Sequence, residues 1–127
     1  MDKAALVSLD IERVSELLEV LERAKLKVGV ALWVYFSEYE DWRLVLSARH
    51  FDSLDIRDAY RSLHDSLNAA GFTPENTPPM MILPTTEPFI RELRRLFGKT
   101  RSVQGMRLGG QMIGDRFVED AYVYRIS

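Results

Sequence analysis

A densely apolar segment of the chain extends from Val28 to Arg49. Its valine, leucine and aromatic residues favour β-strands, and apolar residues are too frequent here for a surface helix. One polar stretch, Ser37 to Asp41, interrupts the segment. We therefore predict a β-hairpin closed by a five-residue loop, a common hairpin connection that pairs Phe36 with Trp42.

Side chains alternate between the two faces of a strand, so this pairing assigns every hairpin residue to a face. The first face is entirely apolar and is assigned to the core; it comprises Val28, Val30, Leu32, Val34, Phe36, Trp42, Leu44, Leu46 and Ala48. The second face is amphipathic and comprises Ala31, Trp33, Tyr35, Arg43, Val45, Ser47 and Arg49. It is either covered by a helix or left open as a binding surface. A one-residue change of register would exchange the faces of one strand.

Three segments have apolar residues at the spacing of a helix. The first extends from about Leu9 to Lys25, and the second from about Leu54 to Ala70. The third begins near Thr86, has Pro88 in its first turn, where a missing N–H costs nothing, and ends at Gly98. The positions assigned to their buried sides are Ile11, Val14, Leu18, Leu21, Ile56, Tyr60, Leu63, Leu67, Ala70, Phe89, Ile90, Leu93, Leu96 and Phe97.

Three further segments are predicted as strands: Met80 to Leu83, Val103 to Leu108 and Arg116 to Ile126. The turn between the last two contains three glycines, so Gly109-Gly110 could close a tight hairpin or belong to a longer loop. The element order α-β-β-α-β-α-β-β predicts an α+β fold in which three helices pack on a mixed, largely antiparallel sheet. The pattern leaves open whether the helices cover one sheet face or both.

Length and composition restrict the class of protein. A chain of 127 residues is expected to form a single domain, residues 1–127. The absence of cysteine fits a reducing compartment, so we expect a cytoplasmic protein, and it excludes thiolate ligands for a metal. His50 and His64 form no metal-binding motif, and we expect no metal and no cofactor. No signal-peptide pattern is present, and no apolar run approaches the ~20 residues of a membrane helix.

Charge gives one candidate binding site. The net charge is −2, so general affinity for nucleic acid is not expected. A local basic cluster, which could contact a phosphate or nucleic acid, comprises Arg91, Arg94, Arg95, Lys99 and Arg101. No aromatic residue is available to stack a base there, because Phe89 and Phe97 belong to the buried side of the helix. A solvated helix face is the favoured interpretation.

The last predicted strand carries a second polar candidate, formed by the adjacent acids Glu119 and Asp120. Adjacent residues point to opposite faces of a strand, and a buried carboxylate requires a partner. Arg43 and Arg107, both on predicted strands, are suitable partners. The arrangement is either a ligand or general-acid site, or a structural ion pair or exposed sheet edge, and we favour the structural interpretation.

Three short motifs resemble those of a set of small uncharacterised bacterial proteins. They are Trp42-Arg43-Leu44, Gly105-Met106-Arg107 and the segment from Asp120 to Arg125. Some proteins of this kind are mobile-element or gene-cassette products. The resemblance extends over most of the chain beyond the first helix. It implies an intact small domain and brings with it no known activity, cofactor or catalytic residue.

Phosphate-binding, zinc-protease and hydrolase motifs are absent from the sequence. The leading hypothesis is therefore a non-enzymatic interaction module that forms a homodimer through its sheet. Trp33, Tyr35, Arg43 and Val45 are expected in or beside the contact, because aromatic residues and arginine are enriched at interface centres. The alternative is a small-molecule or nucleic-acid binding protein that uses the basic cluster. An enzyme built on Asp120 is the least supported hypothesis.

Overall fold

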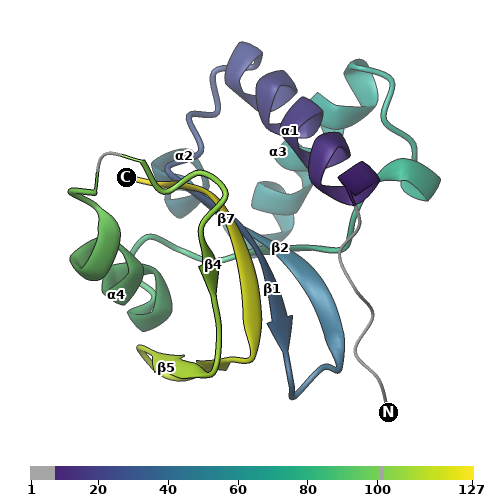
Figure 1. Cartoon of the computed structure of the whole chain (residues 1–127). Coiled ribbons are helices and arrows are strands. Elements are labelled where there is room, and N and C mark those ends of the chain that lie inside the picture. Colours follow the sequence, from purple (N-terminus) through teal and green to yellow (C-terminus); the bar gives the residue numbers. More distant parts are fainter. Residues whose placement is uncertain (1–7, 101) are drawn as a thin grey trace.

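The structure is a computed structural model that describes residues 8–100 and 102–127, arranged as shown in Figure 1. In chain order its elements are α1 (Ser8–Arg23), β1 (Val30–Phe36), β2 (Asp41–Ser47), α2 (Arg49–Asp52), α3 (Ile56–Ala69), the 3₁₀ helix η1 (Pro74–Asn76), β3 (Met80–Ile82), α4 (Pro88–Phe97), β4 (Arg107–Leu108), β5 (Gln111–Ile113), β6 (Arg116–Val118) and β7 (Asp120–Ile126).

Five strands form the central sheet in the order β3-β2-β1-β7-β4. β2 and β3 are parallel, and the other neighbouring strands are antiparallel. β5 and β6 form a separate two-stranded sheet. The longer helices are α1, α3 and α4. The predicted α+β class, with a mixed and largely antiparallel sheet, is therefore confirmed.

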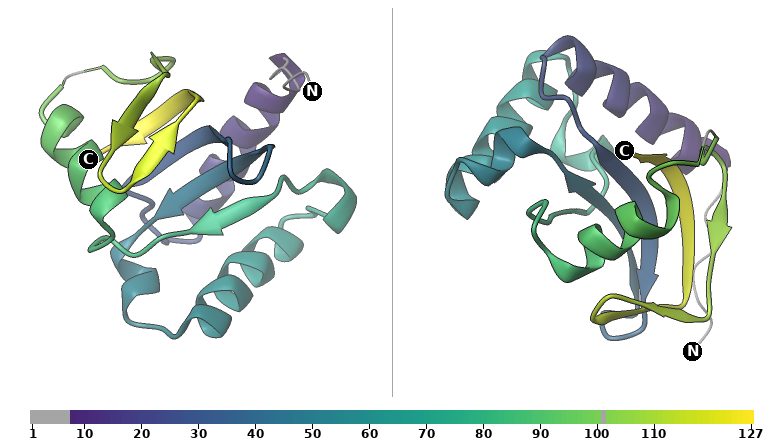
Figure 2. Two further views of the ribbon diagram at one scale, coloured as in Figure 1. Left: turned by 90° about the horizontal axis from the view of Figure 1, so that it is seen from below. Right: turned by 90° about the vertical axis from the view of Figure 1, so that its left-hand side faces the viewer.

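Helices pack on both faces of the central sheet, as Figures 1 and 2 show. α1 and α3 cover one face, where Leu17 and Leu63 pack with Trp33 and Leu44. α4 and the β5–β6 hairpin cover the other face. There the packed residues are Val30, Leu32, Val34, Phe36, Val45, Phe89, Ile90, Leu93, Ile113, Val118, Ala121 and Val123. Two apolar layers thus enclose the sheet. This explains why the sequences of its strands are almost continuously apolar.

The predicted register of the first hairpin is wrong by one residue. The strands are joined by residues 37–40, and Phe36 pairs with Asp41 instead of Trp42. Glu40 has a φ of 51°, a left-handed conformation that closes this shorter turn. Leu44 consequently lies opposite Trp33, on the face that had been assigned as amphipathic. Because helices cover both faces, the apolar pattern of β2 fits either register equally well.

Helices on both faces of the sheet remove the exposed patch on which the homodimer prediction depended. Trp33 and Tyr35 are only 5% and 8% exposed, and Val45 is fully buried. Arg43 is half-buried, and its guanidinium lies 4.3 Å from the ring centroid of Tyr39. Helix α1 packs on the face that contains Trp33 and Tyr35, and α4 packs on the face that contains Val45. The four residues are therefore part of the chain's own core or beside it.

The predicted second helix and last hairpin also differ from the structure. The predicted helix, about Leu54 to Ala70, is α3, and the short helix α2 before it was not predicted. Ile56, assigned to the buried side, is exposed at the first turn of α3, and Ala70 is exposed just after the last turn. Leu96 is likewise exposed on α4. The predicted final strand breaks before Asp120, and its first part folds back on β5 as β6. The tight turn is residues 114–115, not Gly109-Gly110.

Candidate functional site

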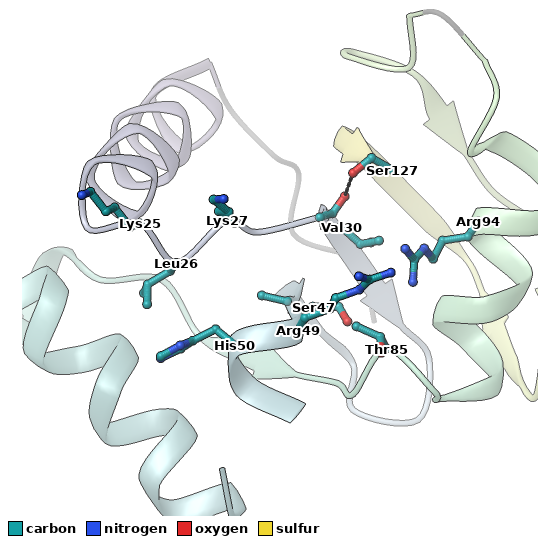
Figure 3. Close-up of a pocket in the computed structure, with 12 residues that line it drawn as sticks. Lys25, Leu26, Lys27, Val30, Ser47, Arg49, His50, Thr85, Arg94 and Ser127 are labelled. Carbon is teal, nitrogen blue, oxygen red and sulfur yellow. Dashed lines mark hydrogen bonds between the residues drawn. The ribbon is translucent and has the colours of Figure 1, made fainter. Parts of the chain in front are cut away.

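A pocket of about 300 Å³ lies at the end of the sheet where β1 begins and β2 ends, shown in Figure 3. Its wall comes from five separate segments: the α1–β1 connection with the first residue of β1, the end of β2 with the start of α2, the loop after β3, α4, and Ser127 after β7. No aspartate or glutamate is among the residues that line it. The side chains that line the pocket therefore carry a net positive charge.

Four cationic side chains line this pocket: Lys25, Lys27, Arg49 and Arg94. In Figure 3 the side chains of Arg49 and Arg94 extend toward each other from α2 and α4, whereas Lys25 points away from them at the rim. None of the four side chains has an ion pair or hydrogen bond to a residue in 8–100 or 102–127. Two guanidinium groups that face the same cavity with no acidic side chain between them repel one another, and an anion bound there would reduce that repulsion.

Ser47 adds a buried polar group to the pocket wall. It is 1% exposed, and its Oγ has no hydrogen-bond partner within the described part of the chain. Its backbone carbonyl is satisfied, because it accepts the N–H of Gly29 at 3.0 Å. An unsatisfied buried hydroxyl costs about 1–3 kcal/mol, so such a group calls for an explanation. A ligand in the adjacent pocket would provide the missing partner.

The pocket floor is apolar. Leu26, Val30 and Ala48 line it, and each is at most 5% exposed. Val30 lies directly opposite Ser47 across the β1–β2 ladder, so the unpaired hydroxyl sits beside an apolar wall. An apolar cavity with a few convergent polar groups is the usual composition of a small-molecule site.

The α1–β1 connection holds its two lysines in unusual backbone conformations. Lys25 and Lys27 have φ values of 63° and 49°. The N–H of Lys25 donates to the carbonyl of Glu22 at 3.0 Å, and the N–H of Leu26 donates to that of Leu21 at 3.1 Å. These two bonds form a Schellman motif with Lys25 at the position that glycine normally occupies. The motif buries Leu26 and places the lysines on either side of it.

Contacts with the β5–β6 hairpin position α4, and with it Arg94. A Cβ added to Gly114 would lie 2.6 Å from the carbonyl oxygen of Pro88, so the hairpin turn packs directly on the first turn of α4. Arg116 pairs with Glu87 at 3.3 Å and with Glu38 at 3.7 Å. Partial burial by itself would lower the pKa of Arg116. The interactions of Arg116 with Tyr39 and Glu87 outweigh this effect and raise the pKa, so Arg116 remains charged and keeps its ion pairs.

His50 and Thr85, two further polar residues of the pocket, already have partners. His50 Nε2 lies 3.2 Å from Ser62 Oγ, and its ring packs edge-on against Phe51. Thr85 binds the carboxylate of Asp52 through its N–H and its hydroxyl, which ties α2 to the loop after β3. Within residues 8–100 and 102–127, no three acidic or histidine side chains come together in a way that could hold a metal ion. The groups that remain for a ligand are therefore mainly hydrogen-bond donors.

The structure divides the predicted basic cluster. Arg94 lines the pocket, but Arg91 is exposed and Arg95 pairs with Glu92 on the same helix. Lys99 is exposed, and Arg101 lies outside the described residues. Of the five residues in the predicted cluster, Arg94 is the one that lines the pocket among those the structure describes.

The predicted acidic site is an ion pair between neighbouring strands. Arg107 Nη2 donates to both carboxylate oxygens of Asp120, at 2.9 and 2.8 Å, and so ties β4 to β7. Glu119 accepts a hydrogen bond from Ser37 at 3.1 Å. Arg43 contacts Tyr39 instead. This geometry matches the favoured structural interpretation of the pair.

Sequence reasoning missed Ser47, Arg49 and the two lysines as members of one site. Two local signals were present: a serine inside an apolar strand, and a Lys-Leu-Lys segment between a helix and a strand. Neither indicates a pocket until the strand ends are brought together with α4.

Comparison of the chain with protein-family models, with curated proteins and with solved structures gave no match. Within the part of the chain that the structure describes, every helix is too short or too polar to cross a membrane. The case for a function therefore rests on the pocket itself.

Proposed function

We propose that the protein binds a small organic anion in the pocket at the end of β1 and β2. One observation carries the proposal: Arg49 and Arg94 face the same cavity, and no acidic residue lines it. The buried hydroxyl of Ser47, which has no partner among the described residues, gives separate support. Arginine is well suited to this role, because its guanidinium donates paired hydrogen bonds to carboxylate or phosphate oxygens.

The proposed activity is binding, because the free groups of the pocket are donors and cations. His50 is engaged with Ser62, whose exposed hydroxyl is not among the lining residues. A small ligand is favoured over nucleic acid because the charge is concentrated in a cavity of about 300 Å³. Nucleic-acid sites instead spread basic residues along an extended face.

Charge reversal on α4 tests the proposal. Phenyl phosphate would be titrated into the protein by isothermal calorimetry, and backbone amide shifts in the NMR spectrum would locate the site. Arg94→Glu is expected to weaken binding by about tenfold or more, because it removes a charged donor and adds a repelling carboxylate.

Arg91→Glu is the matched control, since Arg91 lies on the same helix but does not line the pocket. It should change the affinity by less than about twofold, because solvent and salt screen an exposed charge. Equal losses in the two variants would instead assign the interaction to the exposed helix face. Absence of binding to the unmodified protein would refute the proposal.

A further inference from the structure

We infer that the ligand is a phosphate monoester that carries a small apolar group, an inference that rests on the anion-binding function proposed above. The pocket combines two kinds of surface that one such molecule would satisfy together. Its polar side has Arg49, Arg94 and the Ser47 hydroxyl, and its floor has Val30 and Ala48.

The number and direction of the donors favour phosphate over carboxylate. Arg49 and Arg94 reach into the cavity from α2 and α4, and Ser47 lies at the end of β2, so the donors come from separate walls. A carboxylate presents two coplanar oxygens, which one guanidinium already satisfies as a bidentate partner. A phosphate monoester presents three terminal oxygens in different directions and carries up to two negative charges, so it can engage all three groups.

The size and floor of the pocket favour an organic body on that phosphate. A water molecule has a share of about 30 Å³ in the liquid, so a phosphate group fills only a fraction of the available 300 Å³. The remaining space adjoins Leu26, Val30 and Ala48, which offer no hydrogen bonds from their side chains. An inorganic ion would leave this floor in contact with water, whereas an apolar group would displace that water.

A nucleotide fits the lining less well than a small aryl or alkyl group. Bases are usually held by stacking on an aromatic or arginine face. His50 is the aromatic ring among the lining residues, and it is already engaged by Ser62 and Phe51. The body of the ligand is therefore expected to be compact and apolar.

A ligand series on the unmodified full chain tests the inference. Calorimetric affinities would be measured for phenyl phosphate, inorganic phosphate and benzoate under the same salt conditions. Phenyl phosphate should bind about tenfold or more tightly than inorganic phosphate because of the buried ring, and about tenfold or more tightly than benzoate because of the extra charged hydrogen bonds.

The outcomes separate this inference from the function on which it rests. Equal affinity for phenyl phosphate and inorganic phosphate, both lost in Arg94→Glu, would overturn the apolar body and leave anion binding intact. Benzoate binding as tightly as phenyl phosphate would overturn the phosphate assignment alone. If none of the three binds, both proposals fail.

A substitution in the floor gives an independent readout. Val30→Thr keeps the branched shape but places a hydroxyl against the proposed apolar group, so the ratio of phenyl phosphate to inorganic phosphate affinity should fall severalfold. Val34→Thr is the matched control, because Val34 is buried on the same strand face and does not line the pocket. Circular dichroism would establish that both variants fold. If either does not fold, the affinities of the unmodified protein for the three ligands test the inference without the variants. An unchanged ratio in a folded Val30→Thr protein would overturn the role of the floor.

Discussion

Val30 and Ser47 are direct partners across the β1–β2 ladder, and the buried hydroxyl of Ser47 has no hydrogen-bond partner within the described residues. Ser47→Ala removes this unsatisfied group, so the free energy of unfolding of the ligand-free protein should rise by about 1 kcal/mol. The same change should weaken phenyl phosphate binding. Urea unfolding and calorimetry measure the two effects.

Ser37→Ala serves as the control for that prediction, because the Ser37 hydroxyl is exposed and donates to Glu119 at 3.1 Å. Its loss should lower stability slightly or leave it unchanged. A Ser47→Ala protein that is less stable than the unmodified chain would show that the hydroxyl has a structural partner.

Lys25 occupies a left-handed conformation that glycine adopts without steric cost. Lys25→Gly should therefore raise the free energy of unfolding by about 0.5–1 kcal/mol, measured by urea denaturation. Arg23→Gly, two residues earlier in the last turn of α1, should lower it by about 1 kcal/mol because it weakens the helix. Loss of stability in Lys25→Gly would contradict the Schellman geometry of this turn.

Gly114 packs against the backbone of Pro88, at a φ of 61°. Gly114→Ala should destabilise the protein by about 2 kcal/mol or more, because the new methyl group meets main-chain atoms of α4 that cannot rotate away. The displaced helix should also weaken phenyl phosphate binding through Arg94. Gly71→Ala is the comparison: φ is again positive, but no atom lies within 4 Å of the added Cβ, so a loss of only about 1 kcal/mol is expected.

Trp33 lies between the sheet and α1, at 5% exposure. Trp33→Glu places an unpaired charge in this core and should yield an unfolded chain by circular dichroism. Ile56→Glu, at a position that is 63% exposed, should fold normally. A folded Trp33→Glu protein with an unchanged melting temperature would show that the sheet face with Trp33 is open to solvent, as the hydrophobic pattern first indicated.

Tyr124 donates a hydrogen bond from its hydroxyl to the carbonyl of Ile11 at 3.0 Å. Burial raises the pKa of Tyr124 well above the usual value near 10, and the nearby charges of Tyr122 and Asp10 act in the same direction. The folded state thus favours the protonated phenol. The protonated Tyr124 hydroxyl contributes fully to the free energy of unfolding below pH 10, and this contribution is lost as the pH rises above that value.

An absorbance titration of the folded protein should accordingly show a late step, well above pH 10, that belongs to Tyr124. Tyr124→Phe should remove this late step and reduce the slope of stability against pH above pH 10. A variant that loses amplitude near pH 10 and keeps the late step would show that the Tyr124 hydroxyl is accessible to solvent.

The sequence by itself determined where most elements lie. α1 was expected at about 9–25 and is Ser8–Arg23, and α4 was expected to carry Pro88 in its first turn and to stop at Gly98, as it does. These features depend on the spacing of apolar residues and on the backbone preferences of proline and glycine. Both are local properties, so the order of amino acids is sufficient to reveal them.

Only the tertiary structure decided the hairpin register and the site. Two covered sheet faces make the apolar pattern of β2 compatible with either register, and the left-handed φ of Glu40, not the pattern, selects the one-residue difference. The pocket requires segments near Lys27, Ser47 and Arg94 to meet at one end of the sheet. Such long-range contacts depend on how helices pack across strands, and no local pattern in the chain encodes which cations will share a cavity.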